Sequence, residues 1–142
     1  MINILNLNKK IHLLYGGAQF VCAGAAYNIL ELMWRGYTHI SMFFLGGLCF
    51  SMISLVSRSR RCFLAKSFIC AVLITLAEGL AGCVLNLWLS LNVWDYSNET
   101  FQFMGQICLR FSLLWWALSA MVLPLCKAFD RWRPVGGLAA RE

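Results

Sequence analysis

Residues 92–112 read NVWDYSNETFQFMGQICLRFS, a polar turn that leads into an apolar segment carrying one arginine. With Gly105 placed on Gly46, this stretch aligns without a gap with residues 34–50, WRGYTHISMFFLGGLCF. The pattern predicts an internal repeat. Each copy would be a hairpin of two membrane helices joined by a polar turn.

The chain is too apolar for a soluble globule. Of its 142 residues, 61% are hydrophobic and 13% are charged, whereas soluble domains average about 45–50% and about 25%. A helix needs about 20 mainly apolar residues to cross a bilayer. Four segments meet this need: Ile11–Met33, Ile40–Val56, Leu64–Leu91 and Met104–Leu125.

We therefore expect an all-α, polytopic membrane protein with four transmembrane helices arranged as two repeated hairpins. No segment is left over for a soluble domain, so residues 1–142 are expected to form a single membrane domain. Its expected parts are a first hairpin at about 11–57, a basic inner loop at 58–63, a second hairpin at about 64–126 and a cytoplasmic tail at 127–142.

Lysine and arginine predict the orientation, because they gather on the cytoplasmic side of membrane proteins. If both termini are cytoplasmic, the outer side holds only Arg35 and Arg110 of the 12 basic residues. We expect this orientation in a bacterial cytoplasmic membrane. The net charge of +6 is then a topology signal, and it requires no nucleic-acid partner. The other basic residues fall on the inner side: Lys9, Lys10, Arg58, Arg60, Arg61, Lys66, Lys127, Arg131, Arg133 and Arg141.

Glu78 stands near the middle of the third apolar segment. A central acidic residue costs about 2.5 to 3.5 kcal/mol on membrane-insertion scales, so it is expected to face other helices, a watery cavity or a partner, or to be protonated. Gly82 and Asn86 follow at four-residue steps and form one small or polar stripe with it. The alternative role for Glu78 is an interhelical hydrogen bond that only holds the bundle together.

Further polar residues are expected near the outer ends of the helices, where a cavity open to the outer face would satisfy them together. Glu31 and Arg35 have the spacing of a helical ion pair, which alternatively serves as a surface staple. Asp95 alternatively caps its own turn. The candidate solute or ion pathway is Glu31, Arg35, His39, Glu78, Asn86, Asp95, Gln106 and Arg110.

Arg110 is expected about five residues inside the fourth helix. A buried unpaired charge is far costlier than a paired one, so we predict that Arg110 points into the bundle and is held by Glu31, Glu78 or Asp95.

Aromatic residues are expected in two roles. Trp94 and Tyr96 lie near the outer interface, where such rings anchor helices. Trp115 and Trp116 lie well inside the fourth segment, so at least one is expected to face protein or a pocket.

The sequence carries no catalytic, metal or cofactor motif. It lacks GxSxG, HExxH, Walker A and GxGxxG patterns, and its seven cysteines include no CxxC pair. We therefore expect no enzyme activity, cofactor or metal. Any ATP hydrolysis would come from a separate ATPase subunit.

With these residues in view, the chain resembles the ABC-transporter type IV (CmpB-like) permease family of small bacterial membrane proteins. Glu78, VWDYSN at 93–98, GQICLRFSLLW at 105–115 and YNILELMWRGYTHISMFFLGGLCF at 27–50 carry the resemblance. One departure is residues 100–104, TFQFM, which replace a short segment expected to bear asparagine. The resemblance implies transport without naming a substrate.

Our first hypothesis is a permease subunit with an outer-leaflet polar pocket for a small solute or ion, acting in the lipid bilayer as a homo-oligomer or with an ATPase. The alternative is a non-transporting scaffold or regulatory subunit. A membrane enzyme built from groups beneath the outer turns is the third and weakest hypothesis.

Overall fold

A computed structural model of the chain describes residues 2–131, with side chains from Lys10 onward. Four helices are long and apolar enough to span a membrane, which confirms the expected all-α membrane class. They are α1 (Ile2–Arg35), α2 (Ile40–Ser57), α3 (Phe63–Gly82), which continues as the π-helical turn η1 (Cys83–Trp88), and α4 (Leu109–Arg131). Two short antiparallel strands, β1 (Gln102–Phe103) and β2 (Ile107–Cys108), precede α4.

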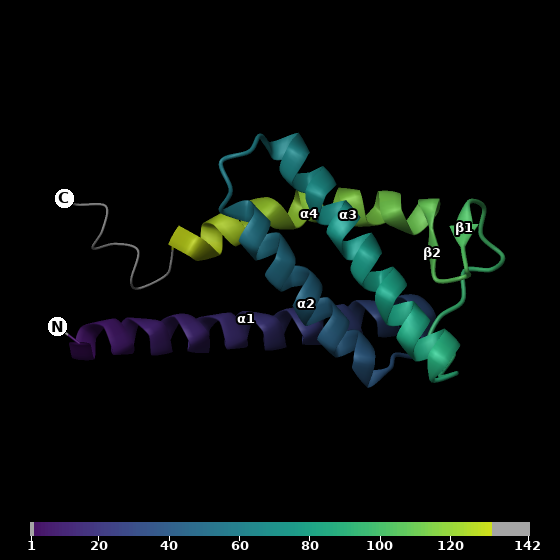
Figure 1. Cartoon of the computed structure of the whole chain (residues 1–142), viewed down its shortest axis with the longest axis horizontal. Helices are drawn as coiled ribbons and strands as arrows, with labels where there is room; N and C mark the ends of the chain where they lie inside the picture. The colour runs from purple at the N-terminus through teal and green to yellow at the C-terminus, as the bar shows by residue number, and fades with distance from the viewer. Residues whose placement is uncertain (1, 132–142) are drawn as a thin grey trace.

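The helices are arranged around α2, which packs against α1, α3 and α4. Helix α1 packs chiefly on α2, and α3 packs chiefly on α4. Figure 1 shows α1 and α4 one below the other, with α2 and α3 running obliquely across both. The start of α1 and the end of α4 lie at one end of the molecule, and the strands lie at the other. The assignment of the first end to the cytoplasm stays a prediction.

Two apolar clusters hold these helices together. One joins Ile53 of α2, Ile74 of α3 and Leu123 of α4, in the half of the molecule that contains the start of α1 and the end of α4. The other joins Met42 and Leu45 of α2 to Val93 and Trp94 from the segment before the strands. The second cluster therefore fixes an irregular segment of the chain against the helices.

The predicted fourth span begins too early. Residues 104–108 belong to the strand hairpin, and α4 starts at Leu109. Met104 and Gly105 both have positive φ values, 53° and 69°, as in the turns that match the natural twist of a β-hairpin. The run FQFMGQIC is apolar enough to resemble a helix start, and only its glycine signals the turn.

The gapless repeat alignment joins residues of different local structure. Gly46 lies within α2, where a Cβ would come within 2.5 Å of the Tyr27 Cβ, so glycine permits close packing of α1 and α2. Gly105 lies in the strand turn with φ 69°. The two glycines thus serve different needs, and the two-hairpin repeat itself stays a prediction.

Candidate functional site

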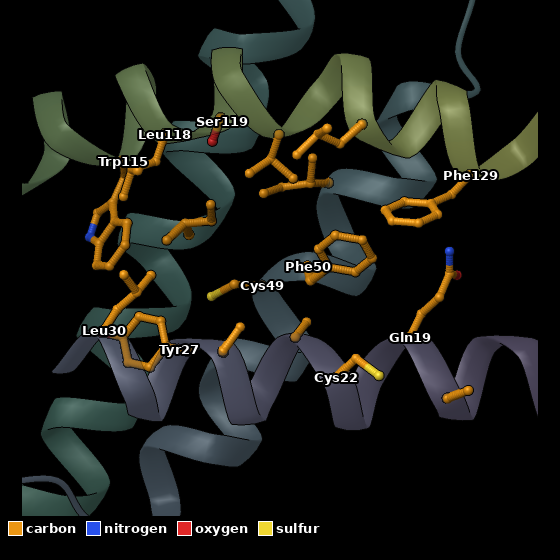
Figure 2. Close-up of a pocket in the computed structure, with 18 of the residues that line it drawn as sticks. Gln19, Cys22, Tyr27, Leu30, Cys49, Phe50, Trp115, Leu118, Ser119 and Phe129 are labelled. Carbon is orange, nitrogen blue, oxygen red and sulfur yellow. The ribbon is translucent and has the colours of Figure 1, made fainter. Parts of the chain in front are cut away.

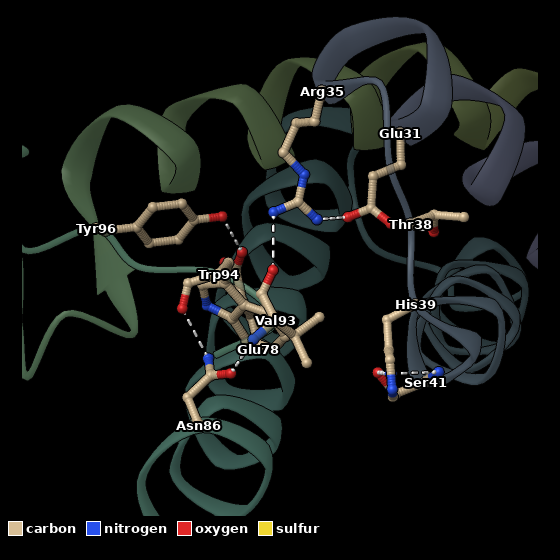
Figure 3. Close-up of polar contacts among 10 residues, drawn as sticks. All are labelled: Glu31, Arg35, Thr38, His39, Ser41, Glu78, Asn86, Val93, Trp94 and Tyr96. Atoms are coloured by element: carbon tan, nitrogen blue, oxygen red, sulfur yellow. Dashed lines mark hydrogen bonds and ion pairs between the residues drawn. The ribbon is translucent and has the colours of Figure 1, made fainter. Parts of the chain in front are cut away.

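Residues 89–108, here called the hairpin segment, cover the end of the bundle and supply most partners of the predicted site residues. Asn86 in η1 is its main anchor (Figure 3). The Asn86 amide nitrogen donates to the Trp94 carbonyl at 2.9 Å and to Gln106 Oε1 at 2.8 Å. The Asn86 amide oxygen accepts from the Val93 N–H at 2.7 Å. The buried amide is therefore engaged on both sides by the hairpin segment.

Gln106 lies in the hairpin segment, not in the outer third of the fourth helix as predicted. Its side-chain nitrogen donates to the Met104 carbonyl at 3.0 Å, and its backbone carbonyl accepts from the Trp94 indole at 3.1 Å. Gly82 of α3 leaves room for it, since a Cβ there would come within 2.5 Å of Gln106 Oε1. The predicted stripe through Gly82 and Asn86 is therefore the surface of the third span on which the hairpin segment packs.

Glu31 and Arg35 form the predicted ion pair at the end of α1 (Figure 3). Glu31 is buried and also accepts a hydrogen bond from the Thr38 hydroxyl. Arg35 donates in addition to the Val93 carbonyl at 3.1 Å. The pair is therefore more than a surface staple, because it fastens α1 to the hairpin segment.

His39 and Asp95 have local roles. His39 caps α2, with its Nδ1 accepting from the Ser41 N–H at 3.2 Å and lying 2.7 Å from the Ser41 hydroxyl. Asp95 is exposed and accepts from the hydroxyl and the N–H of Ser97 at 2.5 and 2.9 Å, as the turn-capping alternative predicts. These bonds from the Ser97 hydroxyl and N–H lower the pKa of the Asp95 carboxyl. Both residues stabilise turns.

The prediction for Arg110 is wrong. It is the second residue of α4, its side chain is 66% exposed, and it pairs with Glu99 at 3.1 Å. It does not pair with Glu31, Glu78 or Asp95. Because α4 begins five residues later than predicted, Arg110 sits at the helix start and reaches back to the hairpin segment. The predicted outer residues are thus joined to this segment instead of lining one shared polar cavity.

Glu78 differs from these residues, because it accepts hydrogen bonds only from neutral aromatic donors. The side chain lies near the middle of the third span and is buried, with 3% exposed. The Tyr96 hydroxyl donates to Oε1 at 2.9 Å and the Trp115 indole donates to Oε2 at 2.8 Å. Within residues 10–131, no lysine, arginine or histidine forms an ion pair with it.

Aromatic stacking holds both donors in place. Tyr96 stacks on Phe111 with ring centroids 4.6 Å apart, and Trp115 stacks on Tyr27 at 6.1 Å. Burial and the negative charge of Glu78 raise the pKa of Tyr96, which keeps the phenol protonated and able to donate. Two neutral donors thus surround the carboxylate.

The role of Tyr96 does not follow from the sequence. Its position near an outer interface suggested an anchor, whereas it links the hairpin segment to Glu78. The position of Trp115 did signal a partner in the protein or a pocket, but not which one. The sequence spacing of Glu78, Tyr96 and Trp115 does not predict that the three side chains are in contact.

An apolar cleft of about 520 Å³ lies between α1 and α4, with α2 and α3 behind it (Figure 2). The Tyr15 hydroxyl donates to the Phe129 carbonyl at 3.2 Å toward one end. The stacked rings of Tyr27 and Trp115 lie at the other end. Trp115 therefore belongs both to the lining of the cleft and to the hydrogen bonds around Glu78.

Comparison with known proteins gives one match. The sequence model of the family described as Putative ABC-transporter type IV matches residues 7–131. No curated protein and no solved structure matches the chain.

Proposed function

Because the chain belongs to this ABC-transporter type IV family, we propose that it is a membrane subunit of a transport complex and that a small solute or ion binds at Glu78. The observation that carries the proposal is the buried carboxylate near the middle of the third span, Phe63–Trp88, without a cationic partner among the described residues. Ionisable residues inside membrane spans commonly mark ion or substrate pathways, because they are costly to keep there.

The hydrogen bonds of Glu78 support exchange with a ligand. Its two partners are a phenol and an indole, which are neutral and belong to two different elements. A cation or proton that reaches the carboxylate would compensate for its charge, which neither donor does. Binding therefore requires only that Tyr96 or Trp115 move aside. No buried ion pair has to be broken.

The energy source is proposed to lie in another chain. The sequence has no Walker A loop, so ATP hydrolysis is assigned to a separate ATPase subunit. We assign no catalytic reaction to this chain, because His39 caps a helix and Glu31 pairs with Arg35. The proposed setting is a bacterial cytoplasmic membrane, with both termini inside and more than one copy in the complex.

A second candidate function is a non-transporting scaffold or regulatory subunit. It is favoured by the hairpin segment, which engages Asn86, Gln106 and Arg35 within the chain itself. In this reading Glu78 only ties the hairpin segment to α4. The apolar surface of the helices would then receive a partner.

Flux through reconstituted proteoliposomes tests the proposal. Vesicles loaded with the pH dye pyranine report protons, and ⁸⁶Rb⁺ and ²²Na⁺ report inorganic cations, with any copurified ATPase supplied together with ATP. Wild type is compared with Glu78→Gln and with the control Glu99→Gln, which alters a carboxylate paired only with Arg110. We expect Glu78→Gln to abolish flux and Glu99→Gln to retain it.

Equal flux in the two variants would contradict a role for Glu78. Stable copurification with one membrane partner, without flux of any probe, would favour the scaffold.

A further inference from the structure

The apolar cleft has the size of a ligand site. Its volume of about 520 Å³ falls within the range of about 300 to 1,000 Å³ typical of small-molecule sites. Small residues of α1, including Cys22 and Ala26, line one side, and Leu118 and Ser119 of α4 line the other (Figure 2). The Ser119 hydroxyl is buried and has no hydrogen-bond partner among the described residues, so one polar group is also available within the apolar lining.

A buried carboxyl group lies directly behind one end of this cleft. The Trp115 ring lines the cleft, while its indole N–H donates to Glu78 at 2.8 Å. In Figure 2 the indole nitrogen points away from the cleft. One side chain therefore separates the cleft from a buried carboxylate that forms no ion pair with the described residues.

The aromatic rings at this end favour the same kind of ligand. Tyr27 and Trp115 stack at 6.1 Å with 29° between their planes. The faces of such rings attract cations, most strongly where water is excluded. Together, an apolar cleft, two aromatic rings and a carboxylate complement a positively charged centre attached to an apolar body.

We infer that the cleft between α1 and α4 binds a lipophilic organic cation, with its apolar body between the helices and its charge at Tyr27, Trp115 and Glu78. This inference rests on the proposed function and names the class of its substrate. The ligand enters from the hydrocarbon region of the bilayer, because the cleft lies between two membrane-spanning helices.

Two other occupants fit less well. A helix from another chain is about 10 Å wide with its side chains, which is too wide to enter a cleft whose two sides are bridged at Tyr15–Phe129 and Tyr27–Trp115. An acyl chain fits an apolar space, but it makes no use of the charge of Glu78. The carboxylate therefore favours the cation over both.

Binding of tetraphenylphosphonium to the purified full-length protein tests the inference. Tetraphenylborate is the matched probe, since it has nearly the same shape and the opposite charge. We expect tetraphenylphosphonium to bind with a micromolar Kd in equilibrium dialysis, and Glu78→Gln to weaken it at least tenfold. We expect tetraphenylborate to show no binding that depends on Glu78.

A pair of neighbouring substitutions tests the location. Ala26 lines the cleft, whereas Ala25 is exposed and does not. Ala26→Trp fills the space and is expected to abolish binding of tetraphenylphosphonium, while Ala25→Trp leaves the Kd within twofold of wild type. Equal effects of the two substitutions would overturn the location.

The remaining outcomes separate this inference from the proposed function. Equal binding of both probes, or a copurified phospholipid that tetraphenylphosphonium does not displace, would show a merely apolar site and overturn the inference. Flux of protons or inorganic cations that depends on Glu78, without tetraphenylphosphonium binding, would overturn the ligand class alone. Tetraphenylphosphonium binding without transport of any probe would support the site and contradict the transport function.

Discussion

Glu31 and Glu78 are both buried carboxylates, yet the regions around them differ in what balances the charge. At the end of α1, Glu31 pairs with Arg35 and accepts from Thr38. Near the middle of the third span, Glu78 accepts from the neutral groups of Tyr96 and Trp115, and from no other group of the described residues. The first arrangement is complete within the chain and serves structure. The second leaves a buried carboxyl group for which the described residues supply no cation, which suits binding of a proton or a cation.

The hairpin segment contacts the two carboxylate regions through different residues. Arg35 and Asn86 fix its first part through the carbonyl or N–H groups of Val93 and Trp94. Tyr96 follows two residues later and contacts Glu78. The anchored backbone at Val93 and Trp94 therefore positions Tyr96, which donates to the candidate ligand-binding carboxylate of Glu78.

The largest effect is expected from breaking the Glu31 region. Arg35→Ala leaves Glu31 buried without its cation and removes the donor to the Val93 carbonyl. Breaking a buried pair costs about 3 to 5 kcal/mol. Arg35 is partly exposed, so we expect a smaller loss than for a fully buried pair, with the free energy of unfolding in mixed micelles falling by about 2 to 3 kcal/mol.

The double variant Glu31→Gln/Arg35→Ala is the control for Arg35→Ala. It removes both charges, and we expect it to recover at least about 1 kcal/mol of the loss, because no uncompensated charge stays buried. A double variant as unstable as Arg35→Ala would show that the salt bridge itself matters little.

A smaller effect is expected where the hairpin segment meets α3. The Cβ of Gly82→Ala would lie within 2.5 Å of Gln106 Oε1, in a position where Asn86 also donates to that oxygen. Overpacking costs about 1 to 3 kcal/mol, and we expect about 1 to 2 because a side chain can shift. The matched change Gly79→Ala meets only the Ile107 Cγ2 at 3.3 Å.

Thermal unfolding of the two alanine variants in detergent measures this difference. Gly82→Ala should melt clearly below wild type, and Gly79→Ala close to it. Equal melting temperatures would mean that the hairpin segment does not depend on the space left at Gly82.

The sequence predicts some features of the Glu31 and Glu78 regions and not others. The span that buries Glu78 follows from a long apolar run, and the Glu31–Arg35 pair follows from helical spacing. The partners of Glu78 do not follow, because Tyr96 and Trp115 reach it from an irregular segment and another helix. Gln106 and Arg110 were misplaced for a local reason, since positive φ values at Met104 and Gly105 interrupt a run whose composition suits a helix.

A still smaller stability effect is expected at Glu78 itself. Glu78→Gln keeps one carbonyl acceptor for Tyr96 or Trp115 and removes the buried charge. The loss of one hydrogen bond costs about 1 kcal/mol, and removing the uncompensated charge offsets part of this cost. We therefore expect unfolding free energy within about 1 kcal/mol of wild type, together with complete loss of the function tested above.

Micelle unfolding and flux measured on the same preparation of Glu78→Gln check this separation. A loss of stability as large as that of Arg35→Ala would place Glu78 in the same structural class as Glu31 and remove the contrast between the two regions.

The smallest effect is expected from Arg110→Ala. Its partner Glu99 lies in the hairpin segment, and the Arg110 side chain is 66% exposed. Exposed ion pairs contribute about 0.2 to 1 kcal/mol because water screens them and two long side chains must be ordered. We expect a loss below about 0.5 kcal/mol that disappears in high salt, and additive effects in the double variant Arg110→Ala/Glu99→Gln to within a few tenths of a kcal/mol. A loss comparable to that of Arg35→Ala, unchanged by salt, would mean that Arg110 is buried in the assembled protein. The hairpin segment would then have a charged anchor on both sides of Tyr96.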